Sequence, residues 1–396
     1  MGGPVGIGVA GLSRAFALMA PTFAGHPGVR LVAAADPRAE ARAAFAAQFG
    51  GTAHASVEAM CADPAVELVY VASPHHLHLE HALAAFAHKS HVMVEKPMAL
   101  TLADCDRMIA AAAASGCKLM VGHSHSFDRP YLAAAGIVAS GKLGPVRMIT
   151  AANYTDFMYR PRRPEELSTE TGGGVIFSQA AHQVDIVRLL AGGLVRSVNA
   201  VVGRWDPDRP TEGAYQAMLT FEGGAVASLT YNGYGHFDSD ELFDWRGELG
   251  QRKDAGAHGA ARLRLDAAGR DGEAALKDAR AFGNAPATAS AALVGHNHFG
   301  QVIVSCERGD LRPVPDGVHV YLGRERSFID LGAPALPRPE VVEEIVSVLR
   351  QGQAMLHSGE WGRATLEVCL GMLGSARTGQ PMPMSRQCRA RLVVPA

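Results

Sequence analysis

The stretch HVMVEKPMAL, residues 91–100, joins a short apolar run to an acid, an amine and a proline. The apolar run predicts a buried strand, and open α/β sheets bind their ligands beyond the carboxyl ends of such strands. A lysine at that edge is costly to bury unless it has a partner or a task. Pro97 biases Lys96 toward extended backbone, so the chain itself aims the amine. We therefore expect Lys96 to carry a proton at a ligand site; the alternative is a surface ion pair between Glu95 and Lys96.

The composition indicates a globular protein with room for two domains. The chain has 396 residues, of which 48% are hydrophobic and 19% charged, enough for two sizeable cores. A net charge of −2 gives no reason to expect a nucleic acid or a membrane as partner, and no apolar run is long enough to span a bilayer. The six cysteines form no CxxC pair, which fits a reducing cytoplasm. We expect a cytoplasmic protein that acts on a small molecule.

The N-terminal residues predict a turn that binds a dinucleotide. An apolar strand over 5–10 runs into a tight turn and then into a helix over 15–23. Gly11 stands at the turn, and Ser13 stands where the backbone must approach a pyrophosphate. The helix N-terminus then offers N–H donors to that anion. The turn residues expected to contact a cofactor are Gly11, Leu12, Ser13 and Arg14.

An acid follows the second predicted strand, which covers 29–35. The carboxylate of Asp36 can accept hydrogen bonds from both ribose hydroxyls of NAD. Arg38 could instead bind the 2′-phosphate of NADP, but Asp36 would repel that phosphate. The sequence therefore favours NAD, with NADP as the alternative.

The pattern of elements changes near residue 124. Strands and helices alternate over 1–124, which predicts a Rossmann domain with a parallel, doubly wound sheet. Residues 125–396 show alternating strands with few helices, which predicts an α+β domain with a large, mostly antiparallel sheet. Within it we expect an irregular insertion over 251–290 and C-terminal helices over 341–377.

Histidines occur in groups that could suggest a metal site. The groups are His75, His76, His78 and His81; His123 and His125; and His296 and His298. Zinc sites usually add a carboxylate or a thiolate in a closed geometry. We therefore predict no metal. We expect His123 and His125 near the substrate, or as packing at the junction of the domains.

Several motifs together resemble one family, the Gfo/Idh/MocA oxidoreductases, over essentially the whole chain. They are Gly11-Leu12-Ser13, Ala35-Asp36-Pro37, Ser73-Pro74-His75 with His78, Glu95-Lys96-Pro97, Gly172-Gly173-Gly174 with His182 and Asp185, and Ser375-Ala376-Arg377-Thr378-Gly379. The resemblance implies a nicotinamide cofactor, a C-terminal sheet whose open face makes a homo-oligomer (dimer or tetramer), and Lys96 and His182 facing the substrate. It adds Ser73, Pro74, His75, His78, Glu95 and Lys96 to the expected cofactor contacts.

Three positions depart from the family pattern. Ser13 replaces a common glycine, Ser178 replaces an acid that often precedes the catalytic histidine, and Ser126 replaces a common arginine. These differences argue against the sugar and inositol substrates typical of the family.

One branch of the family fits better. The stretches 123–128, 155–167, 177–185 and 304–308 resemble the phthalate cis-4,5-dihydrodiol dehydrogenases. That branch implies oxidation of 4,5-dihydro-4,5-dihydroxyphthalate to the catechol. Such a reaction needs a hydride acceptor and a base. Lys96 is the expected base, because an amine beside a cationic nicotinamide loses its proton more readily, and His182 could share or relay that proton.

The carboxylates of such a substrate need fixed cations. Arginine binds carboxylates through paired donors, and three arginines follow a predicted strand in a proline-braced segment. The expected substrate contacts are Arg160, Arg162, Arg163, His123, His125, Gln179 and His182. Alternatively, the arginines pair with Glu165 and Glu166 or lie at a subunit interface.

Three other functions stay open at this point. The first is a sugar or inositol dehydrogenase of the same family. The second is a non-catalytic NAD-binding sensor, against which Lys96 and His182 argue, because a pure binder needs no proton carrier. The third is redox-neutral hydrolysis in which NAD is recycled in place.

Overall fold

The structure of the chain is a computed structural model that describes residues 2–284 and 292–392. Within these residues the chain divides into two compact units. Among the described residues, the first unit draws on 2–123, 275–284 and 336–363, and the second on 124–274, 292–335 and 364–392. From the sequence we predicted that the chain passes from the first domain to the second once, near residue 124. In the structure the chain later returns to the first unit, at 275–284 and again at 336–363. The sequence of a helix shows which of its faces is apolar but does not show which sheet that face covers.

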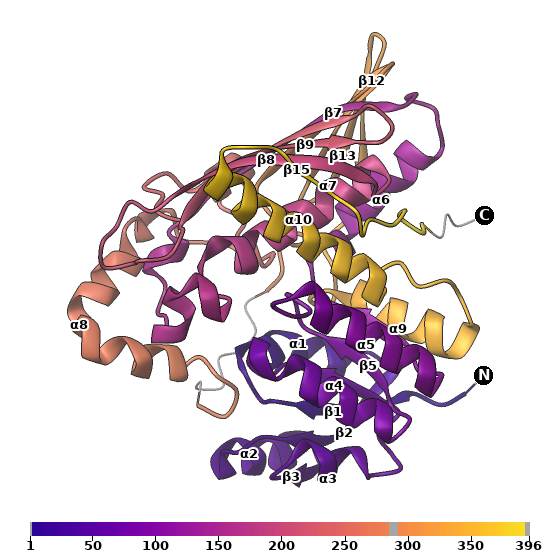
Figure 1. The fold of residues 1–396 in the computed structure, drawn as a ribbon, viewed down its shortest axis with the longest axis vertical. Helices are drawn as coiled ribbons and strands as arrows, with labels where there is room; N and C mark the ends of the chain where they lie inside the picture. Colours follow the sequence, from indigo (N-terminus) through magenta and orange to yellow (C-terminus); the bar gives the residue numbers. More distant parts are fainter. Residues whose placement is uncertain (1, 285–291, 393–396) are drawn as a thin grey trace. The chain divides into compact units, whose positions relative to one another are not determined.

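The first unit is built on a six-stranded parallel sheet with the order β3-β2-β1-β4-β5-β6, of which Figure 1 labels strands β1, β2, β3 and β5. Its strands are β1 Val5–Ala10, β2 Val29–Ala35, β3 Thr52–His54, β4 Leu68–Val71, β5 His91–Val94 and β6 Leu119–Val121. Its helices are α1 Arg14–Gly25, α2 Ala39–Phe49, α3 Val57–Cys61, α4 His78–Ala87, α5 Leu102–Ser115 and α9 Pro339–Gln351. The central strands are almost wholly buried, as expected when crossover helices cover both faces of a parallel sheet.

The strand order of this sheet fixes where a ligand can bind. Strand β1 pairs with β2 on one side and with β4 on the other. The chain leaves β1 and β4 in opposite directions, and the crevice beyond their carboxyl ends is the usual ligand site of such sheets. The predicted motifs at Gly11, Ser73 and Lys96 all follow strands that end at this edge.

The second unit contains a nine-stranded sheet with the order β14-β13-β12-β11-β7-β10-β9-β8-β15. Its strands are β7 Val146–Tyr154, β8 Val195–Gly203, β9 Ala214–Phe221, β10 Val226–Asn232, β11 Gln301–Cys306, β12 Gly309–Val314, β13 Gly317–Leu322, β14 Glu325–Asp330 and β15 Met382–Pro383. Neighbouring strands are antiparallel except for the parallel pair β7 and β10. The predicted fold class, a Rossmann domain followed by an α+β domain with a mostly antiparallel sheet, is confirmed.

Helices of the second unit include α6 Arg129–Ala139 and α7 Ala181–Ala191, while α8 Ala260–Asp278 and α10 Gly359–Thr378 each cross a boundary between the units. Helix α8 corrects the prediction of an irregular insertion over 251–290. Its alanine, leucine and arginine residues favour helix without making a clear apolar stripe, and Gly269 interrupts it with a φ of +63°. The end of the predicted insertion, 285–290, lies outside the described residues. Among the described helices, none is long and apolar enough to cross a membrane.

Candidate functional site

The turn after β1 closes tightly against the end of β4. Gly11 has a φ of +95°, a conformation that favours glycine, and a Cβ added to it would lie 2.9 Å from both N and Cα of Ser73. Its N–H donates to the carbonyl of Ala35 at 2.8 Å. The ends of β1, β2 and β4 therefore meet without room for a side chain, and a ligand can approach bare backbone there.

Helix α1 begins directly after this turn, with Ser13 as its N-cap. Ser13 Oγ accepts from the N–H of Ala15 at 3.1 Å, and the N–H of Leu12 donates to Asp36 Oδ2 at 2.8 Å. Ser13 has a φ of −82°, so its backbone does not require the glycine that is common there. The first-turn N–H groups and the positive end of the helix dipole suit a pyrophosphate. These residues, with Gly11, fit a bound dinucleotide, and we call them the dinucleotide cradle. Arg14 is half-buried as the first residue of α1.

Asp36 and Arg38 form a closed pair at the rim of the cradle. Oδ1 of Asp36 accepts from both N and Nε of Arg38 at 2.9 Å, and Oδ2 accepts from Nη2 at 3.1 Å. Nη2 also donates to the carbonyl of Leu12 at 2.6 Å. Because the carboxylate neutralises the guanidinium, Arg38 is poorly placed to attract a 2′-phosphate. The pairing supports the predicted preference for NAD over NADP.

The segment after β4 is tied to the segment after β5 by a histidine. His78 is fully buried, with Nδ1 3.1 Å from the carbonyl of Pro97 and Nε2 3.0 Å from the carbonyl of Ser73. Burial lowers its pKa. The structure shows His78 as a brace between two loops, and its expected contact with the cofactor stays a prediction. His75 is half-buried and Pro74 is exposed beside it.

Glu95 anchors the end of β5. Its side chain is 7% exposed, and its carboxylate accepts a hydrogen bond from the hydroxyl of Tyr70 and lies 2.9 Å from Nδ1 of His123. Burial alone would raise the pKa of Glu95, but His123, Tyr70 and the neighbouring charge of Lys96 lower it to about 2. We call Tyr70, Glu95 and His123 the Glu95 cluster. Its burial shows that Glu95 does not lie at the surface, and it fixes the backbone from which the half-buried Lys96 extends. The Lys96–Pro97 peptide bond is cis.

His125 lies between two carboxylates in the second unit. Its Nδ1 is 2.6 Å from Asp128 Oδ2, and its Nε2 is 3.5 Å from Glu248 Oε1. Burial alone would lower the pKa of His125, but Asp128 and Glu248 raise it overall. Burial likewise opposes ionisation of Glu248, yet His125 and Arg160 lower its pKa to about 2. The geometry therefore favours a charged imidazole beside the ionised carboxylate of Glu248, with Asp128 on its other side.

Aromatic rings form a wall beside this imidazole. The rings of His125 and His182 lie 4.7 Å apart, centroid to centroid, and Phe299 lies 5.0 and 5.1 Å from them. Phe299 in turn stacks on Tyr231, whose hydroxyl donates to Gln179 Oε1 at 3.2 Å. His182 is presented by α7, which follows the π-helical turn Ile176–Ala180. The hydroxyl of Ser178, which stands in the position of the family's acid, donates to the carbonyl of Gly174.

The three predicted arginines have different surroundings. Arg160 places Nη1 3.8 Å from Glu248 Oε2 and Nε 3.1 Å from Asp156 Oδ1, with 31% of its side chain exposed. Arg162 stacks on Phe157, 3.6 Å from the ring centroid, and pairs with Glu166 at 3.6 Å. Arg163 donates its backbone N–H to Glu166 Oε2 at 2.9 Å. The alternative of pairing with Glu166 thus holds for Arg162, while Arg160 approaches Glu248, the carboxylate that also faces His125.

The predicted residues therefore form one group in each unit. The first unit holds the dinucleotide cradle and the Glu95 cluster, which contains His123, a residue that we expected at the substrate. In the second unit we define the His125 cluster as His125, Asp128, Arg160, His182 and Glu248. Sequence reasoning missed Asp128, although it lies in the quoted stretch 123–128, and it missed Glu248, Phe299 and Tyr70. No local pattern marks Glu248, because the residues around it show no periodicity.

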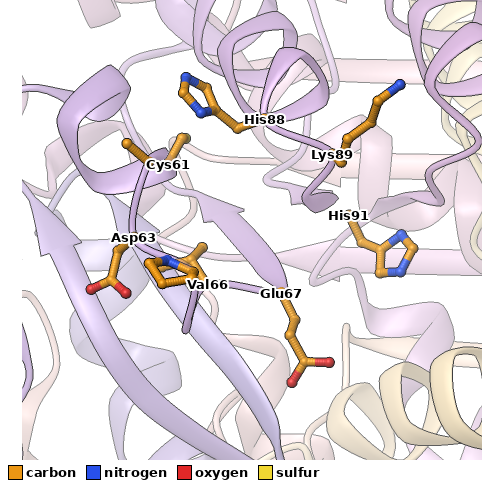
Figure 2. A pocket seen from close by; sticks show the side chains of 9 residues that line it. Cys61, Asp63, Val66, Glu67, His88, Lys89 and His91 are labelled. Atoms are coloured by element: carbon orange, nitrogen blue, oxygen red, sulfur yellow. The ribbon is translucent and has the colours of Figure 1, made fainter.

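A separate cavity of about 410 Å³ lies at the opposite edge of the parallel sheet (Figure 2). It sits at the amino ends of β4 and β5 and is lined by Cys61, Ala62, Asp63, Pro64, Val66, Glu67, His88, Lys89 and His91. Carboxyl ends of parallel strands face away from this edge. The cavity contains none of the predicted site residues.

A Rossmann unit with a dinucleotide cradle, followed by a unit with an open sheet and a histidine cluster, defines a two-domain nicotinamide-dependent oxidoreductase. Residues 5–123 match the family model described as oxidoreductase family, NAD-binding Rossmann fold, and residues 131–251 match the GFO/IDH/MocA C-terminal domain. The chain belongs to the Gfo/Idh/MocA family and is an NAD-dependent dehydrogenase. The predicted family, enzyme class and cofactor are confirmed.

Individual relatives and one solved structure show which proteins the chain resembles. The chain is 44% identical over 371 residues to 1-carboxy-3-chloro-3,4-dihydroxycyclohexa-1,5-diene dehydrogenase of Comamonas testosteroni, covering 93% of this chain and 94% of that one. It is 32% identical over 216 residues to inositol 2-dehydrogenase of Streptomyces avermitilis, covering 53% and 61%. A solved structure from Bordetella bronchiseptica RB50, provisionally described as a dehydrogenase, aligns with a TM-score of 0.91 at 38% identity, covering 96% and 100%. The closer resemblance to phthalate dihydrodiol dehydrogenases stays a prediction.

Proposed function

We propose that the chain oxidises carboxylated cis-dihydrodiols of aromatic acids to catechols, with 4,5-dihydro-4,5-dihydroxyphthalate as the specific substrate. The observation that carries the proposal is the placement of Arg160, a partly exposed guanidinium in the His125 cluster, in the same unit as the aromatic wall of Phe299. A guanidinium suits a carboxylate, and an aromatic face suits a six-membered ring. The 44% identical relative, whose name specifies a carboxylated dihydroxycyclohexadiene, supports this substrate class.

In the proposed oxidation, each residue of the site has a separate role. Bound NAD⁺ supplies the acceptor for the hydride that leaves the carbinol carbon. Lys96, held by the Glu95 cluster, takes the hydroxyl proton, and His182 shares or relays it. Arg160 holds a ring carboxylate, with Arg162, Arg163 and Gln179 supporting that segment. The hydroxydienone that results enolises to a catechol, and the gain of an aromatic ring favours oxidation.

The test is NADH formation, followed by absorbance, with purified protein, NAD⁺ and phthalate cis-4,5-dihydrodiol. A cis-dihydrodiol with one carboxylate and myo-inositol are run beside it. We expect turnover of the carboxylated diols, and a fall of about 10²–10⁴-fold in Lys96→Ala, because a positioned base contributes about that much. Activity that survives in Lys96→Ala would assign the base elsewhere. Turnover of inositol alone would favour the sugar or inositol reading, and NADH binding without any turnover would favour a sensor.

We further propose a homo-oligomer, dimer or tetramer, through the open face of the nine-stranded sheet. Strand register places Met148, Val201, Met218 and Val226 on one face, where they are 49%, 64%, 52% and 37% exposed. An apolar face of this kind marks an interaction surface. Light scattering that shows a monomer at every concentration would contradict it. All six cysteines are unbridged, which suits the cytoplasmic location that we propose.

A further inference from the structure

Glu248 differs from the other carboxylate that faces His125. Asp128 is 3% exposed in its side chain and lies 2.6 Å from the imidazole. Glu248 is 23% exposed, and its oxygens lie 3.5 Å from His125 Nε2 and 3.8 Å from Arg160 Nη1. Both separations exceed the length of a well-formed hydrogen bond. An ionised carboxylate has about four acceptor positions, so Glu248 keeps acceptor capacity at an accessible place in the cluster.

The flanking cations determine which ligand groups Glu248 can bind. His125 on one side and Arg160 on the other keep it ionised, and an ionised carboxylate only accepts hydrogen bonds. A complementary ligand must therefore offer donors. Two vicinal cis-hydroxyls offer two O–H donors that one carboxylate can accept together, whereas a single hydroxyl offers one.

We infer that Glu248 recognises the vicinal hydroxyls of the substrate, while Arg160 beside it takes the ring carboxylate. The inference rests on the proposed function and extends it by naming the residue that selects a diol over a monohydroxy ring. It also gives a role to a carboxylate that the resemblance to the family did not indicate. Glu248 is then a specificity-determining residue, and His125 and Asp128 are positioning residues that hold it.

The test compares binding of two aromatic acids to the NADH-loaded protein by calorimetry. The probes are 3,4-dihydroxybenzoate and 4-hydroxybenzoate, which differ by one hydroxyl. We expect the wild-type protein to bind the dihydroxy acid at least about tenfold more tightly, the usual strength of a hydrogen bond to a charged group. Glu248→Gln should lose most of that preference, while its affinity for 4-hydroxybenzoate changes less than about twofold.

Matched variants separate recognition from a structural role. Glu222→Gln makes the same chemical change at an exposed turn of the second unit and should leave both affinities unchanged. Glu248→Asp keeps the charge and should recover part of the preference. An equal loss of both ligands in Glu248→Gln would overturn the inference, because it would show that Glu248 only holds Arg160 and His125. So would a wild-type protein that binds both probes equally.

Turnover of the dihydrodiol, measured in parallel, keeps the two proposals apart. Turnover without a Glu248-dependent preference refutes the role of Glu248 alone. A Glu248-dependent preference without turnover refutes the proposed reaction and leaves Glu248 as a ligand for vicinal hydroxyls.

Discussion

Each unit buries a histidine beside a carboxylate. The histidine of the first unit has one carboxylate partner, and the histidine of the second unit has two. In the first unit Glu95 serves as the carboxylate for His123, and burial lowers the pKa of that histidine. In the second unit His125 is shared by Asp128 and Glu248, and the two carboxylates raise its pKa although it is buried. In the first unit, burial, Arg338 and Lys96 together outweigh the single carboxylate of Glu95, whereas in the second unit two carboxylates outweigh burial.

The difference also separates a structural pair from a site that can bind a ligand. The side chain of Glu95 is 7% exposed and receives donors from two strand ends, so it fixes backbone and has little access to a ligand. Glu248 is 23% exposed and held at longer distances. The closed Glu95 cluster fixes the backbone from which Lys96, the proposed base, extends. The more exposed His125 cluster, which includes His182, leaves carboxylate oxygens of Glu248 that can accept hydrogen bonds from a substrate.

The contrast between the closed Glu95 cluster and the open His125 cluster predicts its largest effect for Glu95→Ala. Removing this carboxylate leaves the buried donors of Tyr70 and His123 without their acceptor, and breaking a buried pair costs about 3–5 kcal/mol. We expect the free energy of unfolding to fall by that amount in urea titrations. Hydrogen exchange should show the loss in peptides of the first unit, since both partners belong to it.

The matched control is Glu343→Ala, at an exposed position of α9 in the same unit. An exposed substitution of this kind changes stability by less than about 0.5 kcal/mol. If Glu95→Ala costs no more than the control, the Glu95 cluster does not anchor β5, and the contrast between a closed and an open cluster fails.

Local pattern was enough to predict the parts of the site that depend on neighbouring residues. The apolar strand, the acid, the lysine and the proline of 91–100 follow one another, so strand, edge and amine could be placed from the sequence. Gly11 could be placed for the same reason, because a turn between a strand and a helix is a local feature. Asp36 follows from the end of the next strand.

Contacts between distant residues could not be predicted in this way. Glu248 meets His125 only because the second unit folds its loops together, and no spacing in the sequence expresses that contact. Which of the three arginines approaches Glu248 was equally hidden: Arg162 stacks on Phe157 at 3.6 Å and pairs with Glu166, whereas Arg160 lies farther from that ring, at 5.7 Å, and approaches Glu248. Helix α8 was missed because its residues favour helix by propensity rather than by an apolar stripe.

The Glu95 cluster and the His125 cluster should also differ, by a smaller amount, in how their contribution to stability depends on pH. The lowered pKa of Glu95 contributes stability that is complete above its ordinary value of 4.5 and is lost as the pH falls toward about 2. The raised pKa of His125 contributes stability that is complete below its ordinary value of 6.5 and is lost as the pH rises through the raised value. The two contributions therefore fail at opposite ends of the pH range.

Asp128→Asn should remove a contribution that is present below the raised pKa of His125 and absent at the alkaline end of the range. The variant loses a charged partner of His125, so at pH 6 its free energy of unfolding should be roughly 2 kcal/mol below that of the wild type. The gap should narrow as the pH rises, because a neutral His125 gains little from Asp128. Histidines that Asp128 does not influence titrate alike in both proteins and cancel in the difference, whereas His296, which Asp128 also influences, adds to it. Asp310→Asn, at an exposed position of β12, should give a small gap that does not vary with pH. If the difference in free energy of unfolding between the wild type and Asp128→Asn stays constant from pH 6 to pH 9, then the carboxylates do not raise the pKa of His125.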